Sequence, residues 1–126
     1  MLITNFPEYA RQIQAVINEL TSTGEARLLN LQIDARSNLR GYIAGLLQFQ
    51  DGADLHFREF VDVSQPDPRL MYAYHYQDAY QKLIFRYDNA RHRPALSQPE
   101  HKHTLAGIES AAAPSLSQLL DEILQG

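Results

Sequence analysis

Cysteine is absent from this sequence of 126 residues. Its absence excludes disulfide bonds, thiolate nucleophiles and zinc or iron–sulfur sites with cysteine ligands. The sequence also contains no run approaching the roughly 18 apolar residues of a membrane-spanning helix, and its first residues do not form a signal-peptide pattern. These absences predict a cytoplasmic protein with no membrane partner.

Common catalytic signatures are missing as well. There is no G-x-S-x-G nucleophile elbow, no Walker phosphate loop, no H-E-x-x-H zinc motif and no glycine-rich dinucleotide turn. The usual signatures of hydrolases, nucleoside triphosphatases, zinc proteases and oxidoreductases are thereby excluded. The side chains that remain for chemistry are acid/base groups and cations, without a dedicated nucleophile.

Hydrophobic periodicity predicts one α+β domain over residues 1–126, with an N-terminal helix, a five-stranded, mostly antiparallel sheet and a C-terminal helix. Asn5 can cap the first helix, with Glu8 at the third position of a capping box. Ser115 begins the last helix in the same way, with Gln118 as its partner. Apolar alternation predicts the five strands at 26–35, 39–50, 54–63, 70–77 and 82–89.

The expected hairpin registers decide which side chains share a face of the sheet. A three-residue loop pairs Phe49 with Leu55, and a four-residue loop pairs Tyr76 with Leu83. The aromatic residues of the last hairpin then form a core face under a helix. If the third and fourth strands are neighbours, the opposite face carries four polar side chains with Arg58 beside His75: Arg58, His75, Arg86 and Asp88.

A basic, histidine-rich segment follows this pattern. Residues 70–104 hold four of the five histidines and five of the eleven Lys/Arg residues. From Lys82 to His103 the local charge is +3, in a chain of net charge −4, which indicates a local anion site. In extended chain, His101-Lys102-His103 directs both imidazoles to one side, a spacing that suits a shared anion or a metal ion. His56 is expected to be an ordinary surface residue of its strand.

Acid/base groups and cations without a nucleophile suit a substrate that brings its own nucleophile. RNA does so, because a base can drive its 2′-hydroxyl onto the adjacent phosphorus. Arginine and lysine side chains would then stabilise the charge that develops on the phosphoryl oxygens.

Several short runs keep the order and approximate spacing of a known family. They are Arg58-Glu-Phe60, Tyr74-His-Tyr-Gln77, the LIFRYDN run of residues 83–89 with His92 behind it, His101-Lys-His103 and the Pro-Ser-Leu start of the last helix. Over residues 40–124 the chain thus resembles the TumE-like toxins of toxin–antitoxin pairs. The resemblance implies a cognate antitoxin, commonly a small helix-turn-helix protein, and ribonuclease action. Its motif positions are Arg58, Glu59, His75, Arg86, Tyr87, Asp88, Asn89, His92, His101, Lys102 and His103.

We therefore predict a toxin that cleaves RNA without a cofactor. Its catalytic residues would be His75, Arg86, Asp88, His101 and His103. His75 or His101 would be the general base, His103 the general acid, and Asp88 would orient a histidine. Phosphate would be bound by Arg58, Arg86, Lys102 and His92.

Two alternatives remain open. The histidine spacing also suits a metal-dependent nuclease with the ligands Asp88, His92, His101 and His103. The net charge of −4 also suits a non-catalytic interaction module whose acidic surface binds a basic partner, because a free-standing RNA-binding protein is usually basic.

Overall fold

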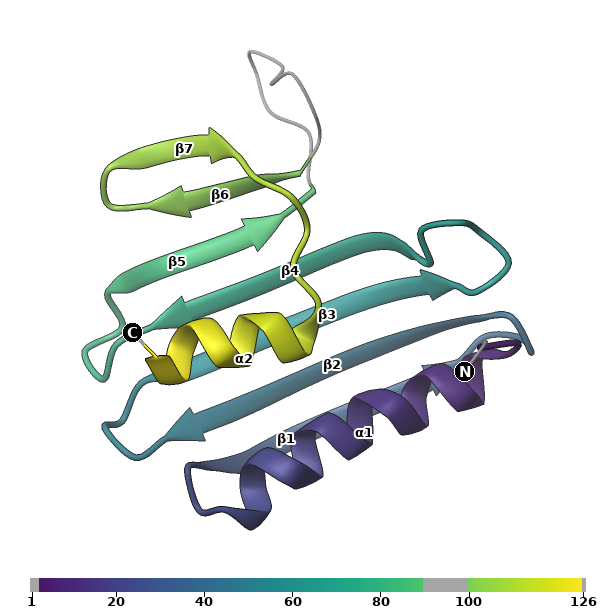
Figure 1. Cartoon of the computed structure of the whole chain (residues 1–126), viewed down its shortest axis with the longest axis horizontal. Helices are drawn as coiled ribbons and strands as arrows, with labels where there is room; N and C mark the ends of the chain where they lie inside the picture. The colour runs from purple at the N-terminus through teal and green to yellow at the C-terminus, as the bar shows by residue number, and fades with distance from the viewer. Residues whose placement is uncertain (1–2, 90–99, 126) are drawn as a thin grey trace.

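The computed structural model describes residues 3–89 and 100–125, which form one antiparallel sheet with a helix at each end of the chain (Figure 1). The strands follow one another across the sheet in sequence order from β1 to β7. The elements are α1 (Phe6–Ser22), β1 (Ala26–Ala35), β2 (Arg40–Phe49), β3 (Asp54–Asp62), β4 (Arg69–Gln77), β5 (Leu83–Asp88), β6 (His101–Thr104), β7 (Gly107–Ser110) and α2 (Leu116–Gln125). Among the described residues, no helix has the length and apolar character needed to cross a membrane.

The predicted α+β class and both helices are confirmed, but the number of strands was wrong. The described sheet has seven strands, because β6 and β7 form an additional hairpin beyond β5. Each of these strands is only four residues long, and β6 reads His-Lys-His-Thr. So short and polar a run shows no apolar alternation. Its strand conformation comes from backbone pairing with β5, where Asp88 lies opposite His101.

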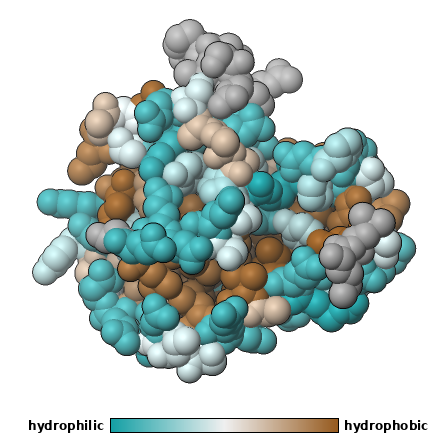
Figure 2. Space-filling model, in the orientation of Figure 1, coloured by the Kyte–Doolittle hydropathy of each residue, from teal (hydrophilic) through white to brown (hydrophobic). Residues whose placement is uncertain are grey.

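Both helices lie on the same face of the sheet (Figure 1). The Asn5 side chain accepts a hydrogen bond of 2.9 Å from the Glu8 amide, as the sequence predicts. At the start of α2, Ser115 and Gln118 exchange hydrogen bonds of 2.9 and 3.1 Å, which confirms the second capping box. Figure 2 shows this helix-covered face, with hydrophobic surface between the polar outer sides of the two helices.

The registers differ from the predicted ones by two residues. In the β2–β3 hairpin Leu47 pairs with Leu55, where Phe49 was expected. The loop does contain three residues, but they are 50–52, closed by a hydrogen bond of 2.8 Å from the Phe49 amide to the Ala53 carbonyl. Gly52 has a φ of 88°, a left-handed conformation that glycine adopts without strain at the last position of such a loop.

The β4–β5 hairpin shows the same displacement. Tyr76 lies opposite Phe85 and not Leu83. One residue of this shift arises at the turn, where Gln77 pairs with Leu83 and not Lys82, and the other from a bulge between Tyr76 and Gln77. The predicted neighbourhood of β3 and β4 is confirmed, although Arg58 lies opposite Ala73 and not beside His75. A shift of two residues leaves every side chain on its predicted face, since faces alternate with period two.

A buried polar network joins the helices to the sheet on the core face. The Glu59 side chain is 1% exposed and accepts hydrogen bonds from the hydroxyls of Tyr9 and Tyr74, the latter at 2.5 Å. Arg69 donates to the Tyr74 hydroxyl at 2.9 Å and to the carbonyl of Pro114, just before α2. Glu59, a motif position of the family resemblance, therefore links α1, the sheet and the start of α2.

Replacing Glu59 with alanine is expected to lower the free energy of unfolding by about 2–4 kcal/mol, because two tyrosine hydroxyls lose their buried acceptor. Glu59→Gln retains an acceptor and is expected to cost about 1 kcal/mol. Urea unfolding followed by circular dichroism at neutral pH measures both. Equal losses in the two variants would contradict a role for the acceptor.

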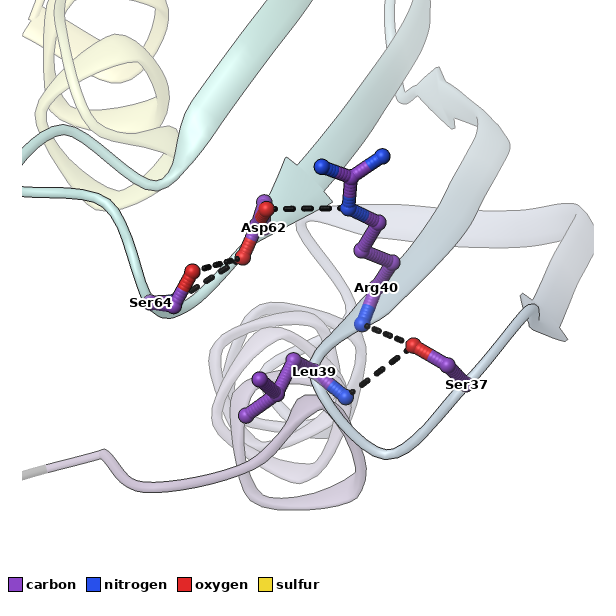
Figure 3. A network of polar contacts seen from close by, with 5 residues as sticks. All are labelled: Ser37, Leu39, Arg40, Asp62 and Ser64. Carbon is purple, nitrogen blue, oxygen red and sulfur yellow. Dashed lines mark hydrogen bonds and ion pairs between the residues drawn. The ribbon is translucent and has the colours of Figure 1, made fainter.

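A second network of polar contacts lies where β2 begins and β3 ends (Figure 3). Asp62 accepts hydrogen bonds from the Ser64 hydroxyl at 2.6 Å, the Ser64 amide at 3.0 Å and Arg40 Nε at 2.9 Å. The Ser37 hydroxyl accepts a hydrogen bond of 3.1 Å from the Arg40 amide and so shapes the preceding turn. The hydrogen bonds from Ser64, and then the contact with Arg40, lower the pKa of Asp62 below its ordinary value.

This lowered pKa predicts how Asp62 contributes to stability as the pH changes. The folded state holds the carboxylate ionised more strongly than the unfolded state, so the contribution is present at neutral pH and is lost below about pH 4. Asp62→Asn should therefore be less stable than the wild type at pH 7, and the difference should shrink as the pH falls below 4. Chemical unfolding across this range measures it, and a constant difference would contradict the assignment.

Candidate functional site

The face of the sheet away from the helices carries an open groove of about 1060 Å³ that extends from β1 to β5. Small side chains keep it hollow, since Ala44 and Ala73 lie on either side of Arg58 in the neighbouring strands. Arg58 itself is exposed along the groove. The other polar side chains that line it include Tyr42, Asp54, His56, His75, Gln77 and Arg86.

His75 lies in the middle of the polar part of this groove. Its Nε2 is 3.2 Å from Gln77 Oε1, and its Nδ1 is 3.4 Å from Arg86 Nη1. An arginine can only donate, so Nδ1 is the acceptor and Nε2 carries the proton, which is the neutral tautomer. His75 lies opposite Arg86 in the β4–β5 register, which explains the contact.

The environment of His75 favours its neutral form. Burial lowers the pKa of His75, the hydrogen bond to Gln77 opposes this, and the Arg86 charge lowers the pKa further. On β3, His56 also lowers it and Asp54 raises it slightly. The net direction is downward, so the His75 imidazole is neutral at pH 7 and able to accept a proton.

His56 is a groove residue that the sequence analysis missed. It lies directly opposite His75 in the β3–β4 register, with 6.4 Å between the ring centroids. Its Nε2 is 3.3 Å from Asp54 Oδ1, so a carboxylate orients the ring. The alternation of β3 puts His56 and Arg58 on one face, and only the observed register shows that His56 is the partner of His75.

A second cluster lies beside the groove, on β5 and β6. The Asp88 carboxylate accepts a hydrogen bond of 2.8 Å from Arg86 Nε, contacts His101 Nε2 and lies 3.4 Å from His103 Nε2. Asp88 and His101 are 4% and 0% exposed, so their contact is shielded from solvent. Arg86 contacts both His75 and Asp88 and therefore connects the groove to this cluster.

Lys102, a predicted phosphate ligand, lies on the other face of the sheet. Its Nζ is 2.8 Å from Glu122 Oε1 of α2 and 5.0 Å from the centre of the Tyr87 ring. The Tyr87 hydroxyl also donates to Glu122, at 3.1 Å. These contacts hold α2 against β5 and β6. His92, the other predicted phosphate ligand of this segment, lies outside the described residues.

The structure thus brings together most of the predicted site residues, in two groups. Arg58, His75 and Arg86 share the groove, whereas Asp88, His101 and His103 form the adjoining cluster. The first group offers a neutral imidazole that contacts the guanidinium group of Arg86, with a second arginine, Arg58, lining the same surface depression. Such a set can bind a phosphodiester and remove a proton beside it.

Comparison with known proteins gives one match. A family model described as Toxin TumE matches residues 22–126, from the last residue of α1 to the end of the chain. No curated protein and no solved structure matches. The matched range contains both groups of polar side chains and the whole described sheet.

Proposed function

The chain belongs to the TumE toxin family, and we propose that this toxin is a metal-independent ribonuclease of the cytoplasm. The observation that carries the proposal is His75, a neutral histidine that contacts an arginine inside an open groove. A phosphate bound by Arg86 would lie beside His75 Nδ1, where proton removal from RNA is needed.

Side chains that line the groove can carry out each proton transfer of transesterification. His75 removes the proton of a ribose 2′-hydroxyl, and the 2′-oxygen then attacks the adjacent phosphorus. The bond from phosphorus to the 5′-oxygen breaks, and His56, in its protonated form, donates a proton to that oxygen. The products are a 2′,3′-cyclic phosphate and a 5′-hydroxyl, so water is not consumed in this step.

Two arginines stabilise the charge of the transition state. Arg58 and Arg86 line the groove from β3 and β5, on either side of the strand that carries His75. Guanidinium groups donate several hydrogen bonds to phosphoryl oxygens and remain charged throughout. Asp88 is a positioning residue in this scheme, since its carboxylate accepts from Arg86 Nε and fixes the guanidinium plane.

Membership of a toxin family indicates an antitoxin partner. We propose that this partner is a small helix-turn-helix protein, as the resemblance of the motif positions implies. An antitoxin that covers the groove would neutralise the toxin by excluding RNA. Co-purification of the two proteins, followed by an RNA cleavage assay of the complex, tests this: activity equal to that of the free toxin would contradict groove coverage.

The enzymatic proposal is tested with purified, untagged protein and single-stranded RNA in excess EDTA. We expect multiple turnovers and products that end in a 2′,3′-cyclic phosphate. The matched control is an oligonucleotide with 2′-deoxyribose at every position, which lacks the attacking hydroxyl and should stay intact. Intact RNA, or equal cleavage of both oligonucleotides, would overturn the proposal.

A further inference from the structure

The cluster beside the groove has the composition of a metal site. One ligand atom from each of Asp88, His101 and His103 lies within 4.8 Å of the other two. We propose that these residues bind one divalent transition-metal ion of the zinc class, which fastens β6 to β5. This inference does not depend on the proposed function, because a protein that cleaves no RNA can still bind zinc.

The strand register creates this convergence. His101 and His103 are two residues apart on β6, so both imidazoles lie on the same face of the strand. Asp88 is opposite His101 on the neighbouring strand, and both histidines turn Nε2 toward its carboxylate. Ligand atoms bonded to zinc at about 2.0–2.2 Å lie roughly 3–4 Å apart, so small side-chain rotations suffice to close the site.

The donor set selects the class of metal. Two imidazole nitrogens and one carboxylate oxygen suit zinc and its transition-metal neighbours, whereas magnesium and calcium prefer oxygen ligands alone. Zinc with three protein ligands completes a tetrahedron with water or another donor. The site is shielded from solvent, because His101 is fully buried and the Nε2 atom of His103 is buried although its side chain is 20% exposed.

The surroundings of Asp88 also suit a metal ligand. Its Oδ2 accepts the hydrogen bond from Arg86, while its Oδ1 faces His101. A hydrogen bond to the remaining oxygen of a ligating carboxylate fixes its orientation, as is usual around protein-bound metals. Asp88 and the two histidines lie on either side of the connection between β5 and β6, so an ion bound here would act as a cross-link.

The test uses the full, untagged chain, which is freed of metal with EDTA, dialysed and then mixed with zinc or magnesium. We expect one zinc per chain by elemental analysis and, at about 100 times the dissociation constant, a rise in Tm of about 5–10 °C. Magnesium should give no rise. Absence of bound zinc and of a thermal shift in the wild type would overturn the inference without any variant.

Variants then locate the ion. Asp88→Asn and His103→Gln should lower zinc affinity by about 100-fold or more, because even loss of a group that only orients a ligand costs 10–100-fold. His56→Ala is the matched control and should retain the affinity, although His56 and Asp54 also form an imidazole–carboxylate pair. Unchanged affinity in both cluster variants, or a loss confined to His56→Ala, would overturn the assignment. Circular dichroism verifies that each variant is folded.

Discussion

His75→Ala is expected to lower the rate of RNA cleavage by about 10²–10⁴-fold, the usual contribution of a positioned general base. Neither of its neighbours can replace it. Gln77 has no basic group, and the guanidinium group of Arg86 donates hydrogen bonds but accepts none. The loss should appear mainly in kcat, since His75 contributes proton transfer and the arginines contribute phosphate binding.

Growth of bacteria under a tightly controlled promoter extends this prediction to the cell. Wild-type protein should arrest growth, and His75→Ala at a matched soluble level should not. Tyr80→Ala is the control, because Tyr80 is 86% exposed in the β4–β5 turn. Arrest by both variants would show that toxicity does not need His75 and would favour a non-catalytic interaction module. Arrest by neither, with the wild type active, would point to a general loss of folding.

The sequence predicted the face of the sheet on which a side chain lies better than it predicted the residue opposite on the next strand. Alternation along a strand assigns each residue to a face, and both hairpin registers were wrong by two residues, which preserves that assignment. Direct neighbours do depend on the register. Arg58 was therefore expected beside His75, the position that His56 occupies. A bulge after Tyr76 and the start of a loop at Gln50 leave no clear mark in the apolar pattern.

Lys102 was expected on the wrong face of the sheet because strand β6 was not predicted. No strand was predicted at His101-Lys102-His103, and all three side chains were expected at one phosphate site. As strand β6, the same run sends Lys102 to the helix face, where it binds Glu122, and both histidines to Asp88. The alternation was visible in the sequence, but only pairing with β5 makes the run a strand. That pairing joins residues separated by a long connection and is invisible to local patterns.

Arg86→Met is expected to lower the cleavage rate by about 10²–10³-fold, because a donor to the phosphoryl oxygens is lost while most of the apolar stem is kept. Lys102→Met is the matched control: it removes a cation from the neighbouring strand, on the opposite face. It should weaken the attachment of α2 and leave the cleavage rate of the folded protein close to that of the wild type. Equal losses in the two variants would indicate a general electrostatic effect and contradict a role in the groove.

The pH dependence of RNA cleavage by Arg86→Met separates two effects of Arg86: stabilisation of charge on the phosphate and lowering of the pKa of His75. The groups that face His75 are His56 and Asp54 on β3, Gln77 on its own strand and Arg86 on β5. Arg86 is among those that lower the pKa of His75, so its removal should raise that pKa. A general base works only when deprotonated, and kcat/KM therefore falls as the pH drops through the pKa of His75. This fall is the acidic limb of the profile of kcat/KM against pH. In Arg86→Met the acidic limb should move to higher pH, whereas in Lys102→Met it should stay in place. A lower rate with an unmoved limb would mean that Arg86 acts on the phosphate alone and that its contact with His75 does not tune the base.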